Sequence, residues 1–459
     1  MFKKTIYTIF LLLATCQLYA QLDTSLVKEL EQVQNAYINT DELVMKVAVY
    51  THSNGKRTLL SNGQMAMDTS NYYSNLNGME VIINSKYFNK IINFDEKLGI
   101  LRAESGITID EMIKFLLPKG WFLKVTPGTK FATLGGCIAS DVHGKEHHLE
   151  GCFSENLVEF KLLINKNEVI QLNSSSHPDL FKATCGGMGL TGFIIDATIR
   201  CKKIKSSYIN FNKILNNNID DVFSCFEKYK SSNYSVAWLD TKKNKNNFKS
   251  IFIHGGFCEK SKLSLNNKSI LNIPFSIKVI NNLSIKIFNY LYFFWNSLII
   301  KKGIISYENF FYPLDKVRNW NNLYGRDGFL QYQFIIPKEN AKEAILEVLN
   351  YLNKVNYLSS LAVLKLHGNK NSNFISFPIS GYSLALDFPY NNKINLILNE
   401  LDKIVLKFKG RVYLTKDSRL SSYFFRKFYL QFEEITKVRK KYNIFNFSSS
   451  QSKRIGIDE

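Results

Sequence analysis

Residues 135–148, GGCIASDVHGKEHH, bring two glycines together with three histidines, a lysine and a glutamate. Residues 143–147 match H-x-x-E-H, a zinc-protease signature in which both histidines must share one face of a regular helix. No helical periodicity precedes the motif, and a glycine inside a helix costs about 1 kcal/mol relative to alanine. We therefore expect no metal site here and interpret the stretch as a loop that holds another ligand.

Glycine itself is the more informative residue of this region. Residues 126–145, TPGTKFATLGGCIASDVHGK, and residues 184–195, TCGGMGLTGFII, are both glycine-rich. Glycine lets main-chain N–H groups approach a ligand closely, and a nest of such groups suits a pyrophosphate. Neither cluster has the strand, G-x-G-x-x-G and helix order of a Rossmann site. Two clusters about 50 residues apart suggest one long cofactor held between them.

The composition favours an anionic partner. The chain has 459 residues, enough for two or three domains, and its 59 basic and 39 acidic side chains give a formal net charge of +20. Such a chain attracts anionic membranes, phosphorylated ligands or nucleic acid. The sequence contains no zinc finger, RNP1-like run or basic region with heptads, so we expect an anionic membrane surface and no nucleic acid. Seven cysteines without a C-x-x-C pair argue against a disulfide framework.

Two apolar runs bear on localisation. Residues 1–20, MFKKTIYTIFLLLATCQLYA, have the layout of a secretory signal peptide, with a retained anchor or a leading strand as alternatives. Residues 287–300, IFNYLYFFWNSLII, are too few to span a bilayer comfortably. This second run is either a core element or an interfacial segment that touches lipid.

Hydrophobic periodicity predicts an α+β protein whose strands are too mixed in their connections for a doubly wound nucleotide fold. A first unit extends to about residue 203, and a second α+β unit with an antiparallel sheet follows. The predicted elements of the first unit are a helix (41–55), strands (57–60, 79–84 and 98–104), a helix (108–120) between the cap Thr108 and the stop Gly120, a hairpin (157–173), a helix from 177 and a long strand (192–204). Those of the second unit are strands (234–240, 250–256, 329–337, 361–368 and 382–389), helices (339–355 and 392–410), and a last single helix (423–442).

The order of several motifs resembles the vanillyl-alcohol oxidase-type flavoproteins, whose cofactor domain is also called the PCMH-type FAD-binding fold. Within that group the chain is most similar to the branch that oxidises decaprenylphosphoryl-β-D-ribose. The motifs are PGTKFATLGGCIASDVHGKEHH, FKATCGGMGLTGFIIDATI, YSVAWLD, NWNNLYGRDGFLQYQF, LKLHGNKN, LALDFP and RVYLTKDSR. The resemblance implies a FAD-binding domain over residues 21–203, a substrate (cap) domain over 204–410, and a segment 411–459 that returns to the FAD domain.

The resemblance also implies non-covalently bound FAD and a set of residues that hold it. These are Gly63, Gln64 and Met65 in the loop SNGQMAMD, then Gly128, Thr129, Thr133, Gly135, Gly136, Ser140 and His143, with Ile194 and Tyr413 closing over the cofactor. The family usually has a richer glycine loop where this chain has SNGQMAMD, which leaves the pyrophosphate contacts there open.

The chemistry implied by the resemblance is oxidation of a secondary alcohol, with hydride leaving carbon and a base accepting the hydroxyl proton. Lys416 matches the family's essential lysine, either as that base or as a cation that stabilises the alkoxide. The implied substrate residues are Lys145, Trp238, Gln333, Lys365 and Asp387, of which the two lysines suit a substrate phosphate. From the residues alone, Lys416 would be a solvated turn residue and Trp238 a core residue.

Three positions depart from the family pattern. Ala385 stands where the family has a pocket cysteine, His367 where an aromatic residue is more frequent, and Phe311 where a tyrosine is found. Inhibitors that need the pocket thiol are therefore expected to fail. The head group or the lipid length of the substrate is expected to differ as well.

The expected function is FAD-dependent oxidation of the 2-hydroxyl of a polyprenyl-phosphate-linked pentose, the first half of a lipid-sugar epimerisation in cell wall biosynthesis. A separate short-chain reductase would complete the epimerisation. Oxidation of an aldonolactone or a free sugar is the alternative, and a basic exported protein that no longer binds flavin is a third. The signal-like segment places the protein outside the cytoplasm, periplasmic and membrane-associated, with the cytoplasmic face of the inner membrane as the alternative.

Overall fold

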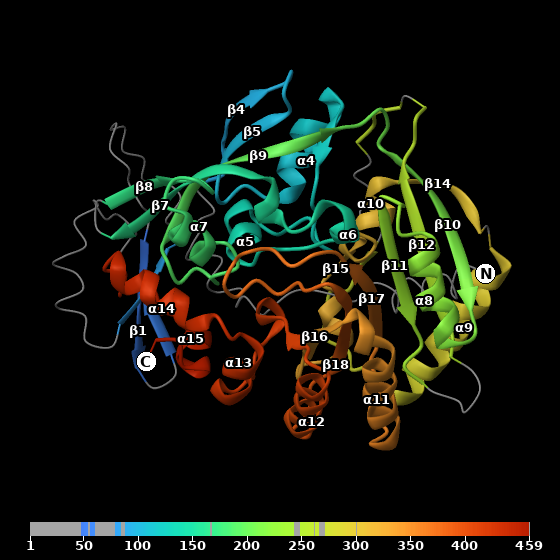
Figure 1. The fold of residues 1–459 in the computed structure, drawn as a ribbon. Helices are drawn as coiled ribbons and strands as arrows, with labels where there is room; N and C mark the ends of the chain where they lie inside the picture. The colour runs from blue at the N-terminus through green and yellow to red at the C-terminus, as the bar shows by residue number, and fades with distance from the viewer. Residues whose placement is uncertain are drawn as a thin grey trace.

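A computed structural model gives the fold of the chain (Figure 1). It describes residues 47–53, 56–59, 79–83, 88–165, 168–242, 248–260, 262–265, 271–299 and 301–458. The predicted signal peptide and the predicted cofactor residues Gly63, Gln64 and Met65 lie outside these described residues.

An antiparallel sheet forms the scaffold of the first half of the chain. Its strands run in the order β4-β5-β9-β7-β8, and β6 also pairs with β9. The bounds are Ile91–Asp95 for β4, Ile100–Glu104 for β5, Trp121–Leu123 for β6, Leu157–Asn165 for β7, Glu168–Leu172 for β8 and Phe193–Lys203 for β9. Helices α4 (Ile109–Leu116), α5 (Leu134–Ala139), α6 (His147–Glu150) and α7 (Pro178–Thr184) lie between these strands in the chain.

Local chemistry sets the bounds of helix α4. Thr108 and Glu111 form a capping box at its start, because each side chain accepts a hydrogen bond from the backbone of the other. After a short 3-10 turn, Gly120 has a left-handed φ of 77° and reverses the chain into β6. The predicted cap and the predicted end of this helix are therefore confirmed.

A larger antiparallel sheet follows, in the order β14-β10-β12-β11-β17-β18-β16-β19. The bounds are Tyr208–Asn216 for β10, Tyr234–Leu239 for β11, Ser250–Phe257 for β12, Lys302–Ser306 for β14, Phe329–Pro337 for β16, Leu361–His367 for β17, Gly381–Pro389 for β18 and Arg411–Val412 for β19. Helices α8 (Ile219–Lys228), α11 (Ala341–Lys354) and α12 (Ile394–Lys407) pack against it. Phe334, Leu384 and Leu364 lie opposite one another on β16, β18 and β17 and are fully buried, as expected for the apolar face of a half-covered sheet. The α+β fold class is confirmed.

The predicted helix over residues 41–55 is wrong where the structure describes it. Residues Val47–Ser53 form strand β1, which pairs with β2 (Lys56–Leu59) and β3 (Met79–Ile83). The β-branched Val47, Val49 and Thr51 alternate along the segment, a pattern that favours a strand. The partner strand β3 lies far along the sequence, so the local pattern alone did not decide between helix and strand.

The predicted single helix over residues 423–442 is also wrong. The segment forms α13 (Ser422–Phe428) and α14 (Phe432–Lys441), and α15 (Ser450–Ile455) follows. The break lies at Tyr429, whose hydroxyl donates to the Val412 carbonyl across 2.6 Å. Beyond the break, Lys441 pairs with Asp179 of α7 across 2.7 Å, so this segment reaches the first half of the chain.

A buried carboxylate joins the two halves. Oδ1 of Asp141 accepts from the Ser154 backbone N–H. Its Oδ2 accepts from Asn371 (2.6 Å), Asn373 (2.8 Å) and Ser376 (2.7 Å), all in the connection between β17 and β18. Asp141 is fully buried and has a left-handed φ of 41°. The loop that holds the glycine cluster is thereby bound to the second sheet.

We expect Asp141→Asn to destabilise the protein by about 3 kcal/mol, because an amide cannot accept the four hydrogen bonds and the buried donors lose their partner. Asparagine tolerates the left-handed backbone, so the effect reports on the carboxylate. Urea unfolding of both proteins measures the change. The control is Asp327→Asn, which removes an exposed pair with Lys278 and should change stability by less than about 1 kcal/mol. Equal effects of the two substitutions would show that Asp141 does not hold the halves together.

Candidate active site

The predicted substrate residues of the second sheet share one face. Trp238 of β11 pairs with Val363 of β17, which pairs with Ala385 of β18, which pairs with Gln333 of β16. Directly paired residues of antiparallel strands point to the same side of a sheet. These four side chains therefore form a row across the face opposite the one that α8, α11 and α12 cover.

Two more of the predicted residues lie two positions from this row, one on each side of it. Lys365 follows Val363 by two residues, and Asp387 follows Ala385 by two, so both point to the same face. Asp387 is fully buried and its Oδ1 accepts from the Gln331 amide across 3.1 Å. The structure thus brings Trp238, Gln333, Lys365 and Asp387 to one surface.

The loop of the first half lies against this face. The Gln333 amide donates to Nε2 of His143 across 2.9 Å, and the Ser235 backbone N–H donates to the Lys145 carbonyl across 3.0 Å. The His143 ring also stacks on Phe377, with 5.3 Å between ring centroids. His143 and Lys145 are therefore placed at the boundary between the two halves, next to the predicted substrate residues.

The two glycine clusters are also brought together. The Gly186 N–H donates to the Ile138 carbonyl across 3.0 Å, and the Met188 N–H donates to the Ala139 carbonyl across 2.9 Å. The Tyr413 hydroxyl donates to the Ser140 carbonyl across 3.3 Å, which adds the returning segment to the same place. The clusters thus form adjacent walls of one site.

Two observations test whether this site fits a flavin cofactor. A Cβ atom added at Gly128 or Gly189 would meet no atom within 4 Å, so the backbone there is open to a ligand. Nδ1 of His143 is buried and has no hydrogen-bond partner within the described part of the chain. Burial, with the charges of Lys365, His147 and Lys416, lowers the pKa of His143 well below its ordinary value. The ring is neutral, Gln333 occupies Nε2, and the unused N–H at Nδ1 is a donor for a cofactor.

The other predicted cofactor residues differ in their surroundings. The Thr129 hydroxyl donates to Asp315 across 3.2 Å, and the Thr133 hydroxyl caps helix α5 by accepting from the Gly136 N–H. Gly135 lies close to Ser105, where a Cβ would approach to 3.0 Å. Ile194 is buried in strand β9. Thr129, Thr133 and Gly135 therefore have structural contacts that shape the loop.

The residues of the zinc-like motif are occupied by structural hydrogen bonds. Nδ1 of His147 accepts from the Gly368 N–H across 3.1 Å, and its Nε2 lies 3.3 Å from the Cys152 sulfur. Glu146 is fully buried, and its Oε1 accepts from the Thr126 N–H across 2.7 Å. Burial raises the pKa of this carboxyl. These contacts fix the loop that carries Lys145.

Three lysines give the site its charge. Lys145, Lys365 and Lys416 form no ion pair with a carboxylate among the residues that the structure describes. Burial, reinforced by Lys365, lowers the pKa of Lys145 to about 7. Burial, reinforced by Lys416, lowers the pKa of Lys365 to about 8. Burial also lowers the pKa of Lys416, against an opposing effect of Asp387. Buried cations that lie close together without a paired carboxylate attract an anion.

Lys145 does not extend freely toward the other lysines. Its Nζ donates to the Phe310 carbonyl and lies 4.8 Å and 5.7 Å from the ring centroids of Phe310 and Phe311. The predicted role in substrate binding would require this ammonium group to leave the Phe310 carbonyl or to reach the ligand beside it. Phe311, which stands where the family has a tyrosine, therefore makes a cation–π contact with Lys145.

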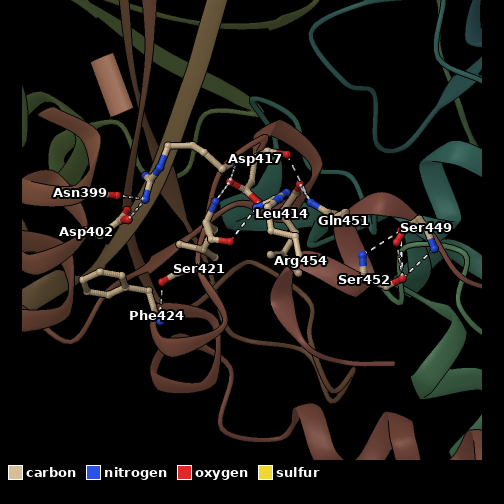
Figure 2. A network of polar contacts seen from close by, with 12 residues as sticks. Asn399, Asp402, Leu414, Asp417, Ser421, Phe424, Ser449, Gln451, Ser452 and Arg454 are labelled. Atoms are coloured by element: carbon tan, nitrogen blue, oxygen red, sulfur yellow. Dashed lines mark hydrogen bonds and ion pairs between the residues drawn. The ribbon is translucent and has the colours of Figure 1, made fainter. Parts of the chain in front are cut away.

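A network at the end of the described chain holds the turn that carries Lys416 (Figure 2). Gln451 of α15 donates to the Leu414 carbonyl across 2.7 Å, at the start of this turn. Arg454 of α15 pairs with Asp417 across 3.0 Å, at its end. Lys416 lies between these two anchors, so α15 fixes the backbone on both sides of it. We refer to these contacts as the α15 clamp.

Comparisons with known proteins agree with this geometry. Residues 38–173 match the FAD binding domain family. Over 397 residues the chain is 30% identical to the decaprenylphosphoryl-beta-D-ribose oxidase of Mycolicibacterium smegmatis, covering 83% of this chain and 86% of that enzyme. The chain belongs to the PCMH-type family of FAD-dependent oxidoreductases.

Other family members match only part of the chain. The D-arabinono-1,4-lactone oxidase of Kluyveromyces lactis is 29% identical over 145 residues, which are 30% of this chain and 27% of that enzyme. The human Delta(24)-sterol reductase is 29% identical over 110 residues, 24% of this chain and 21% of that enzyme. This PCMH-type protein is an FAD-dependent oxidoreductase that acts on CH–OH groups, so the predicted family, cofactor and enzyme class are confirmed.

Sequence reasoning missed the residues that position this PCMH-type site from a distance. Asp141 lies inside the quoted motif but received no role, and its left-handed backbone is visible only in the structure. No sequence pattern marks Gln451 and Arg454 of the α15 clamp, because their partners are backbone carbonyls and a carboxylate more than 30 positions away. Such contacts depend on tertiary structure and not on a local pattern.

We expect Lys365→Met to raise the Tm of the PCMH-type protein at pH 6.5 by a few degrees, because the wild type carries a poorly solvated charge there. The pKa of Lys365 is about 8 when folded, below its ordinary value of 10.5. The unfolded chain binds more protons between these values, so wild-type stability rises over this range and the advantage of the variant fades. Thermal unfolding from pH 6.5 to 10.5 measures the difference in Tm between the variant and the wild type. The control is Lys342→Met, which replaces an exposed lysine paired with Asp220. A difference in Tm that does not depend on pH would contradict the assignment.

Proposed function

We propose that this protein oxidises a secondary hydroxyl of a sugar carried on a polyprenyl phosphate, specifically the 2-hydroxyl of a linked pentose. The observation that supports the substrate class is the set of three lysines at the site, Lys145, Lys365 and Lys416, without carboxylate partners among the described residues. A phosphate next to the sugar would neutralise them, whereas a neutral lactone or free sugar would not. The similarity to a decaprenylphosphoryl-beta-D-ribose oxidase over most of the chain supports the same substrate class.

The residues on the site face divide the work of the reaction. Bound FAD supplies the hydride acceptor, and we propose that it is held non-covalently. Lys416 in its neutral form accepts the hydroxyl proton while the carbon–hydrogen bond breaks as hydride, which leaves a ketone. Burial favours that neutral form, and Asp387 stabilises the protonated form that results. Gln333 fixes the orientation of the His143 ring, whose Nδ1–H has no partner among the described residues and would be available to the cofactor.

Lys365 is the proposed phosphate-binding residue. Its ammonium group projects from the centre of the sheet face, half-buried and without an ion pair in the described chain. The positive charge of Lys416 is close enough to lower the pKa of Lys365. A phosphate that binds Lys365 would therefore place the linked sugar next to Lys416.

A keto sugar still bound to lipid needs a second enzyme. Reduction of the ketone from the opposite face would invert the carbon and complete an epimerisation, so we propose a separate short-chain reductase as partner. The polyprenyl chain keeps both substrate and product at a membrane. We propose that the protein is exported and works at the outer side of the inner membrane, consistent with the signal-like residues 1–20.

A specific observation keeps the alternative, a lactone or free-sugar oxidase, open to test. The D-arabinono-1,4-lactone oxidase of Kluyveromyces lactis shares 29% identity with 30% of the chain. The decaprenylphosphoryl-beta-D-ribose oxidase matches a larger share, 83% of the chain. A lactone or a free sugar also has no phosphate to pair with Lys365.

We expect the purified protein to show flavin absorption that passes to the supernatant on acid precipitation, as for a non-covalent cofactor. Farnesylphosphoryl ribose should bleach the flavin under anaerobic conditions, and arabinono-1,4-lactone should not. Lys416→Met should retain FAD and slow the bleaching by about 10²- to 10⁴-fold, since a proton acceptor is lost. Faster bleaching by the lactone would establish the alternative instead.

Lys365→Met separates phosphate binding from chemistry. We expect the KM for farnesylphosphoryl ribose to rise about tenfold or more, because a charged hydrogen bond is lost, with a smaller change in kcat. The matched control, Lys342→Met, should leave both constants unchanged. An unaltered KM in the Lys365 variant would remove the phosphate from this position.

A further inference from the structure

Helix α9 (Asn282–Leu298) exposes a row of apolar side chains and buries two amide side chains beside Ile285 and Phe288. Its apolar side chains Leu283, Ile287, Tyr290, Phe294 and Leu298 are 67%, 51%, 58%, 46% and 63% exposed. Its amide residues Asn289 and Asn296 are 2% and 5% exposed. A helix at a water-covered surface turns its apolar stripe inward and its polar face outward. The outward face of α9 therefore suits an apolar environment.

The exposed side chains form one continuous stripe. Successive members are three or four residues apart, the spacing that places side chains on the same side of a helix. Tyr290 and Phe294 stack with their rings nearly parallel, 6.4 Å apart. We call Leu283, Ile287, Tyr290, Phe294 and Leu298 the α9 stripe. A contiguous patch of this kind on a protein surface marks an interaction site.

Buried polar contacts hold the stripe outward. The Asn289 amide donates to Asp240 across 2.7 Å, and Lys213 donates to the Asn296 side-chain oxygen across 3.0 Å. Rotation of α9 that buried the stripe would break both contacts and expose Phe288 and Ile285 instead. The orientation is therefore fixed by the fold and is not an accident of a loosely attached helix.

The charge around the stripe is positive. Residues 271–306 contain four lysines and no aspartate or glutamate. Lys278 pairs with Asp327, but Lys286, Lys301 and Lys302 form no ion pair within the described residues. Lys249 lies 5.0 Å above the Tyr290 ring, at the border of the stripe. Apolar side chains flanked by unpaired lysines match the combination of acyl chains and anionic headgroups at a bilayer surface.

We propose that α9 is a membrane-docking helix that lies flat in the headgroup region of an anionic bilayer. Its 17 residues give a length of about 25 Å, and in the described part of the chain no helix is long and apolar enough to cross a membrane. A second copy of the chain is a poorer occupant, because a two-fold contact would bring the same lysines together. For residues 287–300, this proposal favours the interfacial segment over the core element.

The position of α9 also links the membrane to the site. On its inner side, Tyr292 lies 5.0 Å from Trp238, the first residue of the row across the site face. This step rests on the proposed function: a lipid-linked sugar would enter from the bilayer beside α9 and pass Trp238 to reach Lys365. The docking itself does not depend on the substrate.

Vesicle co-sedimentation of the FAD-loaded protein tests the proposal. We expect binding to phosphatidylcholine vesicles that contain phosphatidylglycerol, weaker binding to phosphatidylcholine alone, and release by high salt. The variant Ile287→Ser/Phe294→Ser/Leu298→Ser should lose binding by about tenfold or more, with unchanged FAD content. The matched control Leu98→Ser/Leu396→Ser/Leu430→Ser removes three residues that are 68%, 69% and 80% exposed elsewhere, and should bind as the wild type does.

The other results overturn either the docking proposal or, in one case, only the proposed substrate. Absence of wild-type binding, or equal loss in both triple variants, would remove the bilayer as the partner of the α9 stripe. A wild-type dimer in light scattering that only the α9 variant disrupts would assign the stripe to a second copy. Vesicle binding without turnover of farnesylphosphoryl ribose would leave the docking in place and reject the proposed substrate, so the two failures are distinguishable.

Discussion

A buried carboxylate with four donors, that of Asp141, sets the geometry on which the site depends. Its donors come from both halves of the chain, so the glycine-rich loop and the β17–β18 connection have a single relative position. His143 follows it by two residues and meets Gln333 of the second sheet. Without that register, the open backbone at Gly128 and the charged sheet face would not form one site. The buried carboxylate is tolerated because four hydrogen-bond donors compensate the loss of water around it.

The lysines on the site face, unlike Asp141, lack partners for their charges among the described residues. Lys365 and Lys416 have no paired carboxylate among the described residues, which costs stability in the folded chain. Proteins place such unfavourable charges where a ligand compensates them. Asp141 and the lysines therefore have complementary roles: one charge is fully satisfied and fixes the structure, and the others remain available for an anionic ligand.

The fold class and the strands of the second sheet could be predicted from the sequence, because strands with period-two alternation such as β16 to β18 are recognisable from local pattern. The order of the motifs predicted the family and its FAD cofactor. Residues 47–53 were misassigned since a short apolar run fits helix and strand equally, and a distant strand decided between them. The partners of Asp141 and of Lys145 could not be predicted, because Asn373 and the Phe310 carbonyl are set by tertiary packing.

The α15 clamp has a consequence for when the enzyme becomes competent. Gln451 and Arg454 hold the turn that carries Lys416, yet they are among the last described residues. During synthesis, both sheets are complete before these two residues leave the ribosome. A nascent chain could therefore enclose its cofactor while Lys416, the proposed proton acceptor, is still unpositioned. Under the proposed mechanism, oxidation begins only after α15 docks, so a chain interrupted just before α15 would bind flavin without oxidising a substrate.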